Sequence, residues 1–502
     1  MDITSLSYLL FVAVSLLIYW AVPHKFQWLV LLADSIIFYF SIAKAYTIVY
    51  LLISVLTTFF AGNYFEKEVS QAKKKAALVV TLVINLGILA VLKYTNLLLG
   101  TIDYFSPSNV GRVSWYASLG ISFYTLQLIA YLLDTYWGTS NAEKNPVKLF
   151  LFASFFPQMI SGPISKYNQL SHQLFEEHRF DYVRVTYGLR RIAWGIAKKV
   201  IVADRLSGVV AYLFNDPDTF SGLWVLFAGL CFIVNLYFDF SGCMDIVIGV
   251  AKCFGIELVE NFKAPFLVTT IQEFWRRWHI TLGEWLKIYV MYPILSTKAF
   301  NRLAKKCKEK FGKAGKKMPS YIAMLIVWLL IGLWHGNSWK YVLGEGLGFW
   351  FIIFIGQIGE PVFDKMKAFL HINDKSFGWK CFQIVRTIFL YSMVMIFFRA
   401  DDLPSGLYMI GKFFSKTHIM GPFRELFAAT WGEFGGKWAF MAVAIMGILH
   451  IYVDINVASD RCVQDKLVKL PLVLRWVLYL AFLFLIIFEG AFGKSSFIYF
   501  GF

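Results

Sequence analysis

The chain has 502 residues, of which 58% are hydrophobic and 16% are charged, and its formal net charge is +16. A soluble globular protein is about 45–50% apolar and about 25% charged, so this composition argues against a soluble enzyme. No hydrophilic stretch is long enough to fold alone, which also argues against nucleic-acid binding in spite of the positive charge. We therefore expect a single membrane domain over residues 1–502.

Apolar runs suited to crossing a bilayer, which takes about 20 helical residues, recur along the whole chain. They lie at about residues 3–22, 26–43, 46–62, 76–99, 114–137, 148–164, 187–214, 222–251, 320–335, 341–359, 382–398, 438–456 and 471–491. Some runs would form only half-helices, so the sequence predicts an all-α, polytopic integral membrane protein of about 10–13 spans. The first run has no basic segment before it and no small-residue cleavage site, so we expect it to remain as the first helix of a cell-membrane protein.

The polar side chains that interrupt apolar sequence gather in residues 115–360, which we predict to hold the functional site. Proline also breaks several runs there, at Gly162-Pro163, Ala264-Pro265 and Tyr292-Pro293. Broken helices persist in a membrane only where protein or a water-filled cavity satisfies the freed backbone groups. The six cysteines include no CxxC pair, so the sequence predicts neither a disulfide framework nor a zinc site.

The positive charge is concentrated in three clusters. They are Lys73–Lys75, the set Arg190, Arg191, Lys198 and Lys199, and a dense group between Lys298 and Lys317. Short basic loops face the cytoplasm, where anionic lipid holds them, and we expect this to be their main role. The alternative is that they attract the phosphates of a cytosolic donor such as acetyl-CoA.

Ionisable side chains at membrane depth are costly, so each one calls for an explanation. Asp239, Ser241 and Asp245 lie near the centre of the apolar run 222–251. A spacing of six residues puts the two carboxylates on nearly opposite faces of a helix, unless Gly242 breaks that helix. Either they serve the functional site, or each is paired with an arginine or lysine of a neighbouring helix.

A mixed polar and aromatic segment follows, with the sequence Glu273-Phe-Trp-Arg-Arg-Trp-His-Ile-Thr-Leu282. It is too polar to face lipid, which indicates a short interfacial or re-entrant helix. On one helix Trp275 and His279 would share a face. Arg276 and Arg277, before Trp278, could hold a carboxylate or a phosphate through the paired donors of guanidinium. A histidine of the interfacial aromatic belt is the alternative for His279.

A second histidine, His335, closes the apolar run that ends at Trp334. Neutral imidazole at membrane depth can take a proton from a hydroxyl group, as acyl transfer to an alcohol requires. Gly332 and Gly336 leave room for a substrate or for another backbone, and the polar Asn337 follows. A purely structural histidine is the alternative.

These segments resemble the membrane-bound O-acyltransferase family, and in particular its bacterial branch around the alginate O-acetyltransferase membrane subunit. The matching pieces are Gly120-Ile-Ser-Phe-Tyr-Thr-Leu-Gln127, Phe156-Pro-Gln-Met-Ile-Ser-Gly-Pro-Ile164, Asp239-Phe-Ser-Gly242 through Asp245 and Gly249, Glu260-Asn-Phe-Lys-Ala-Pro-Phe266, Glu273 to Leu282, Gly332-Leu-Trp-His-Gly336, Phe397-Phe-Arg-Ala400 and Phe497-Ile-Tyr-Phe-Gly-Phe502. Single motifs of this length are weak evidence, but their common order along the chain makes the resemblance specific.

The resemblance implies a ring of transmembrane helices with short re-entrant helices around a central tunnel, and a catalytic core at about 115–360. It implies His335 as the essential histidine and general base, with His279 as its partner that positions the acceptor or the acyl carbonyl. The reverse assignment stays open. Asp239, Ser241, Asp245, Asn261, Trp275, Arg276, Arg277, Trp278, Trp334 and Asn337 are the supporting or substrate-binding residues that the matched motifs imply.

The resemblance further implies acetyl transfer from a cytoplasmic thioester, such as acetyl-CoA, to an exported polysaccharide or cell-wall glycan, with no bound cofactor or metal. A secreted or membrane-anchored SGNH-type acetyltransferase would be the partner. One alternative is D-alanyl transfer to teichoic acid from a carrier-protein thioester. A transporter without chemistry is an alternative of another class, although the paired halves with matching broken helices that it predicts are not evident.

Overall fold

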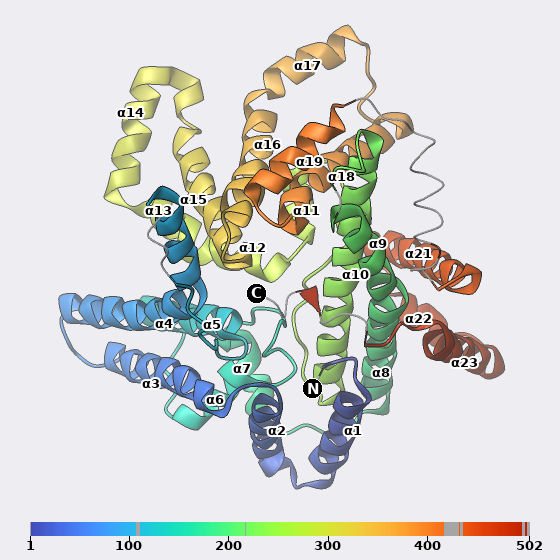
Figure 1. Ribbon diagram of the computed structural model, residues 1–502. Coiled ribbons are helices and arrows are strands. Elements are labelled where there is room, and N and C mark those ends of the chain that lie inside the picture. Colours follow the sequence, from blue (N-terminus) through green and yellow to red (C-terminus); the bar gives the residue numbers. More distant parts are fainter. Residues whose placement is uncertain are drawn as a thin grey trace. The chain divides into compact units, whose positions relative to one another are not determined.

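The computed structural model describes residues 2–106, 111–215, 217–415, 431, 435–493 and 497–498. Within these residues the secondary structure is helical, apart from one isolated bridge between Phe262 and Trp278 (Figure 1). The expected all-α class is confirmed. The chain forms two compact units, and the expectation of a single domain stays a prediction. The first unit holds residues 1–196, 243–260 and 499–502, and the second holds 197–242 and 261–498.

The first unit consists of eight helices and the C-terminal part of a ninth, α10, among the residues described. They are α1 (Leu6–Ala21), α2 (Gln27–Ile42), α3 (Ile48–Phe65), α4 (Gln71–Phe105), α5 (Ile121–Trp137), α6 (Pro146–Ser154), α7 (Tyr167–Phe175), α8 (Tyr182–Ala197) and the end of α10 (Leu223–Cys253), with the short turns η1 (His24–Phe26) and η2 (Ala45–Thr47). Local sequence sets several ends. The Ser5 side chain caps α1, and left-handed Gly120 and Gly138 bound α5.

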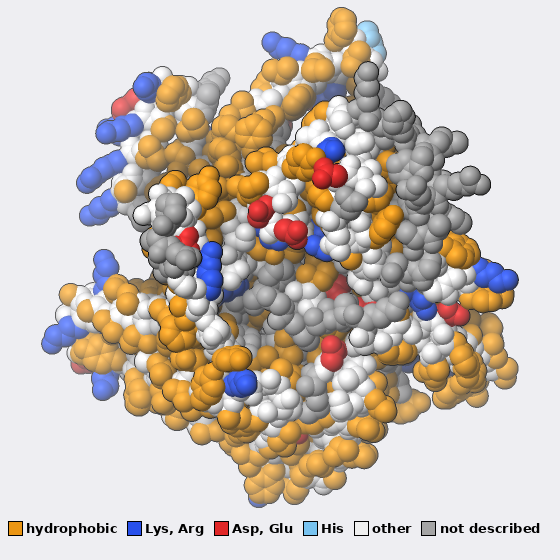
Figure 2. All heavy atoms as spheres, in the orientation of Figure 1, with side chains coloured by type: hydrophobic (Ala, Val, Ile, Leu, Met, Phe, Trp, Pro, Cys, Tyr) orange, Lys and Arg blue, Asp and Glu red, His pale blue; other side chains and the backbone are white. Residues whose placement is uncertain are grey.

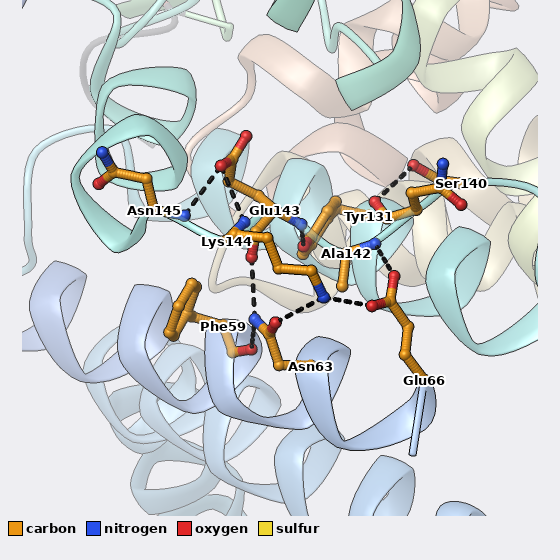
Figure 3. A network of polar contacts seen from close by, with 10 residues as sticks. Phe59, Asn63, Glu66, Tyr131, Ser140, Ala142, Glu143, Lys144 and Asn145 are labelled. Atoms are coloured by element: carbon orange, nitrogen blue, oxygen red, sulfur yellow. Dashed lines mark hydrogen bonds and ion pairs between the residues drawn. The ribbon is translucent and has the colours of Figure 1, made fainter. Parts of the chain in front are cut away.

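A polar network fixes the connection between α5 and α6 in this unit (Figure 3). The Asn63 side chain donates to the backbone oxygen of Glu143 at 2.9 Å, and Glu66 accepts from the backbone nitrogen of Ala142 at 2.6 Å. Lys144 reaches back to pair with Glu66. The C-terminal turn of α3 therefore holds the connection in one conformation.

The second unit contains most of the remaining helices. They are α9 (Asp204–Asn215), the first part of α10, α11 (Ile271–Arg277), α12 (Ile280–Leu286), α13 (Tyr292–Ser296), α14 (Lys298–Gly315), α15 (Met318–His335), α16 (Leu347–Ile358), α17 (Glu360–Phe369), α18 (Phe377–Arg399), α19 (Leu403–Phe413), α21 (Lys437–Ala458), α22 (Val463–Val468) and α23 (Leu472–Glu489). A 3₁₀ turn, η4 (Pro265–Leu267), and three π-helical segments, η3 (Lys198–Ala203), η5 (Lys287–Met291) and η6 (Lys340–Gly346), complete it.

Nine of the described helices are long and apolar enough to cross a membrane, and α1 is a shorter apolar helix of 16 residues. The protein is therefore a multi-pass membrane protein, as the sequence predicts. The run at 148–164 yields only α6, nine residues long, which is one of the expected half-helices. Exposed apolar side chains such as Leu483, Ile487 and Phe488 on α23 are suited to contact lipid tails.

Two of the basic clusters differ in whether their side chains are buried or exposed. The cluster from Arg190 to Lys199 is not a loop, because it lies on α8 and η3, where Lys198 and Lys199 are buried. The expectation of a lipid-facing basic loop is wrong there. In the cluster from 298 to 317, the lysines and the arginine between Lys298 and Lys310 are exposed on α14, and Figure 2 draws such side chains in blue.

Candidate active site

Asp239 and Asp245 lie on α10, which stays helical through Gly242, so the break that the sequence left open does not occur. In the second unit Asp239 pairs with Lys199 at 2.7 Å, and Lys199 also pairs with Asp204 at 2.8 Å. All three side chains are at most 2% exposed, and the backbone nitrogen of Ile498 donates to Asp239 at 2.9 Å. Lys199 is therefore the shared counter-ion of two buried carboxylates.

Asp245 belongs to the first unit and pairs with Arg191 of α8 at 3.0 Å. The same guanidinium binds Glu260 through two nitrogens, each at 2.5 Å. Both carboxylates of α10 are therefore paired with cations of neighbouring helical segments, the second of the two explanations that the sequence allowed. Ser241 lies between them and accepts from Lys198 at 3.3 Å.

The segment around His279 is not one helix, which corrects the expectation that Trp275 and His279 share a helical face. Helix α11 ends at Arg277, and α12 begins at Ile280. His279 stands between them with φ +46° and ψ +51°, a left-handed conformation that residues other than glycine seldom adopt. Such strain persists only where the surroundings enforce it, and it is common at functional sites.

Asn261 supplies that enforcement. Its side-chain oxygen accepts from the backbone nitrogen of Thr281 at 3.1 Å, from the Thr281 hydroxyl at 3.0 Å, and lies 3.3 Å from Nδ1 of His279. Its backbone oxygen accepts from Ile280 at 3.1 Å. Asn261 is fully buried, so one amide group fixes both the turn and the ring that the turn presents.

His335 is the last residue of α15, where the following π segment η6 packs against the helix. A Cβ on Gly332 would lie 2.2 Å from the backbone oxygen of Tyr341, and one on Gly336 would lie 2.3 Å from the Tyr341 ring. The room at Gly332 is thus taken by another backbone, one of the two uses that the sequence predicts, whereas the room at Gly336 is taken by the Tyr341 ring. Nδ1 of His335 lies 2.9 Å from the carboxylate of Glu345 in η6.

The two histidines come together around Trp334. The Trp334 ring lies 5.3 Å from the His279 ring and 5.3 Å from the His335 ring. Both histidines are 2% exposed, and both Nε2 atoms are buried. His279 lies outside the candidate spans of the described residues, and burial, together with the nearby His335, lowers its pKa well below the ordinary value. His279 is therefore neutral at physiological pH and able to accept or donate a hydrogen bond.

The other residues that the sequence predicts in this region are in different surroundings. Trp278 packs among Phe274, Tyr237 and Tyr391, and Trp275 packs on Trp328, so both are parts of an aromatic core. Arg277 pairs with Glu273 one turn before it at 2.6 Å. Arg276 and Asn337 are exposed.

Two functional candidates were missed by the reasoning from sequence. Glu345 is fully buried, although it falls in a run counted as apolar, and a carboxylate between two glycines in that run was a usable signal. Lys199 was counted with a basic surface cluster, and only its buried partners distinguish it. Within the described residues, no group of three or more His, Cys, Asp or Glu side chains could hold a metal ion.

Comparison with known proteins shows similarity to O-acyltransferases. The membrane-bound O-acyltransferase family model matches residues 142–306. A peptidoglycan O-acetyltransferase of Helicobacter pylori is 28% identical over 76% of this chain and 72% of its own length. A probable alginate O-acetylase, AlgI, of Pseudomonas syringae is 28% identical over 81% of this chain and 73% of its own. A teichoic acid D-alanyltransferase of Bacillus subtilis is 27% identical over 45% of this chain and 55% of its own.

The region that matches the family model contains His279. The longer alignments with O-acetylating proteins cover most of the chain. In the structure a second buried histidine, His335, contacts the same tryptophan as His279. The chain therefore contains a region that matches the membrane-bound O-acyltransferase family model, and it is an O-acyltransferase.

Proposed function

We propose that this enzyme moves acetyl groups from a cytoplasmic thioester donor across the cell membrane for O-acetylation of an exported polysaccharide or cell-wall glycan. The relatives named as alginate and peptidoglycan O-acetylating proteins align with more of the chain than the teichoic acid D-alanyltransferase does. The observation that carries the proposal is the pair of buried histidines, His279 and His335, in contact with one tryptophan. Acetyl-CoA is the proposed donor, and an SGNH-type acetyltransferase is the proposed partner.

In the proposed reaction His335 is the general base. Its Nε2 takes the proton of the acceptor hydroxyl while the hydroxyl oxygen attacks the thioester carbonyl. The tetrahedral intermediate then collapses, the carbon–sulfur bond breaks, and the imidazolium returns the proton to the leaving thiolate. The products are an ester and a thiol, with no net change of protons on the enzyme. A base of this kind contributes about 10²–10⁴-fold, or roughly 3–5 kcal/mol of the barrier.

His279, held neutral by burial, is the proposed partner that positions the acceptor or polarises the acyl carbonyl. Its fixed turn is suited to this, because positioning depends on a rigid donor. Asn261 and Trp334 support the two rings through the contacts described above. Roles in binding donor or acceptor remain proposed for the other predicted residues, which are Asp239, Ser241, Asp245, Trp275, Arg276, Arg277, Trp278 and Asn337.

The test uses cells that produce the wild-type protein, His335→Ala, His279→Ala or the control His371→Ala, which changes an exposed histidine after α17. Ester-linked acetate is measured on purified extracellular and wall polysaccharides, with membrane levels of each variant matched. We expect acetate to be lost in His335→Ala and His279→Ala and kept in His371→Ala. Acetate that persists in His335→Ala at normal protein level would contradict the proposal.

D-alanyl transfer to teichoic acid is the second candidate, because the enzymes named for it are also similar to this chain. It would use the same two histidines with a carrier-protein thioester as donor. Ester-linked D-alanine, measured on the same four strains, separates the candidates. D-alanine that depends on His335 while acetate does not would favour the second one.

A further inference from the structure

Glu345 is a carboxylate placed against the histidine that the proposed function makes the base. Its Oε2 accepts from Nδ1 of His335 at 2.9 Å, and its Oε1 lies at the same distance. Glu345 is 0% exposed and His335 is 2% exposed. Burying a carboxylate at such a site costs free energy unless a partner compensates its charge, so the presence of Glu345 there needs an explanation.

The local backbone around Glu345 places its carboxylate beside His335. Glu345 lies in η6, and π-helical turns are frequent at functional sites. The residues on both sides are glycines in tight surroundings. A Cβ on Gly344 would lie 2.5 Å from the Phe397 ring, and one on Gly346 would lie 2.5 Å from the backbone oxygen of Trp328. The Gly-Glu-Gly sequence thus lets the segment pass between α15 and α18 with the carboxylate directed at His335.

We propose that Glu345 is a positioning residue that orients His335 for proton transfer. By accepting from Nδ1 it keeps the proton on that nitrogen, so that Nε2 carries the lone pair that the acceptor hydroxyl requires. When Nε2 takes the substrate proton, the carboxylate stabilises the imidazolium. The same division of labour holds between the aspartate and histidine of the serine protease triad. This inference rests on the proposed role of His335 and adds the group through which that role is achieved.

A second histidine–carboxylate pair in the same unit provides a matched control. His450 and Asp454 lie one turn apart on α21, with Nε2 of His450 3.5 Å from Asp454. Both are buried, at 6% and 8% exposure. The pair therefore has the same chemistry in a similar environment, but it has no part in the proposed reaction.

The experiment compares wild type, Glu345→Gln, Glu345→Asp, Asp454→Asn and His335→Ala in membrane vesicles with matched protein levels. Labelled acetyl-CoA is the donor, the polysaccharide of the producing cells with its ester-linked acetate removed is the acceptor, and initial rates are measured over a range of donor concentration. We expect Glu345→Gln to lower kcat by about 10²–10⁴-fold with little change in the donor KM. Glu345→Asp should recover part of that loss, because it restores the charge, and Asp454→Asn should stay within about threefold of wild type.

The outcomes separate this inference from the function on which it rests. Activity retained in His335→Ala would show that His335 is not the general base, and the inference about Glu345 would then fail as well. Activity lost in His335→Ala but retained in Glu345→Gln would overturn the role of Glu345 alone. A loss in Glu345→Gln that Glu345→Asp does not relieve, or an equal loss in Asp454→Asn, would assign Glu345 a structural role and also overturn the proposal. If Glu345→Gln does not accumulate in the membrane, Glu345→Asp is compared with Asp454→Asn instead. A lower kcat in Glu345→Asp alone supports the proposal, and equal rates in the two variants overturn it.

Discussion

His279 has a left-handed backbone conformation, with φ +46°, that a histidine adopts at an energetic cost. Asn261 offsets this cost because its single side-chain oxygen serves the backbone and hydroxyl of Thr281 and faces the ring of His279. Charged residues follow a similar rule, since Lys199 stands between two buried aspartates. Individual polar groups in this protein therefore have several structural duties each, and removing one leaves several others unsatisfied.

Replacing Asn261 with alanine should show this at the residue scale. Each buried donor left without an acceptor costs about 1–3 kcal/mol, so we expect Asn261→Ala to lower the melting temperature and to reduce acetyl transfer at least about tenfold. Asn261→Asp keeps an acceptor oxygen in place and should retain more of both. The control is Asn301→Ala, which changes an exposed asparagine on α14. Equal melting temperatures and rates for Asn261→Ala and Asn301→Ala would show that Asn261 does not hold the turn.

At the scale of elements, the site depends on how closely a π segment packs on a helix. α15 carries His335 at its end, and η6 carries Glu345 against it. Gly332 permits this approach, because any side chain there would meet the backbone of Tyr341. Backbone has less freedom to move aside than the end of a flexible side chain, so a substitution at Gly332 must displace a whole segment.

We expect Gly332→Ala to separate η6 from α15 and to disturb the His335–Glu345 contact. Overpacking of a buried contact costs about 1–3 kcal/mol, and a displacement near 1 Å at a catalytic group can cost about 10²-fold in rate. The matched control is Gly87→Ala in the middle of α4, where a Cβ would meet nothing within 4 Å. Acetyl transfer and detergent-extracted melting curves should change for the first variant and not for the second. Wild-type rates in Gly332→Ala would contradict the packing argument.

At the scale of the whole molecule, the spans fix which connections share a side of the membrane. Helix α14 precedes α15, and α17 follows α16, so two candidate spans separate them, Met318–His335 and Lys340–Ile358. An even number of crossings returns the chain to the side from which it started. Figure 1 shows α14 and α17 at the same end of the second unit. Because basic segments next to spans are enriched on the cytoplasmic side, the exposed basic face of α14 predicts that this side faces the cytoplasm.

Labelling can check this topology. Lys308→Cys on α14 and Lys365→Cys on α17 replace exposed lysines, in a background from which the six native cysteines have been removed. A membrane-impermeant thiol reagent should label both in inverted vesicles and neither in intact cells. Labelling of the two positions from opposite sides would contradict the two crossings, and labelling of both from outside would contradict the cytoplasmic assignment.

Sequence by itself determined what depends on composition and on local order. Long apolar runs become helices because a bilayer leaves unpaired backbone groups no other partner, so the class of protein and most spans followed directly. The residues Glu273 to Leu282 and Gly332 to Gly336 indicated the family and both histidines, because these motifs are contiguous in the chain. The pairing of buried carboxylates with lysine or arginine could be offered as an alternative, since an isolated charge at this depth is too costly to leave unpaired.

The tertiary structure alone decided the contacts between segments far apart in sequence. Asn261 and Thr281 are 20 residues apart, and no periodicity predicts that their hydrogen bonds would break a helix at His279. Lys199 and Asp239 are 40 residues apart, so a lysine that looked like part of a basic surface proved to be a buried counter-ion. Glu345 reaches His335 through a π-helical turn, whose extra residue shifts the face that a regular helix would present. These contacts depend on how distant segments pack together, and the sequence around each residue does not show which distant segment will lie beside it.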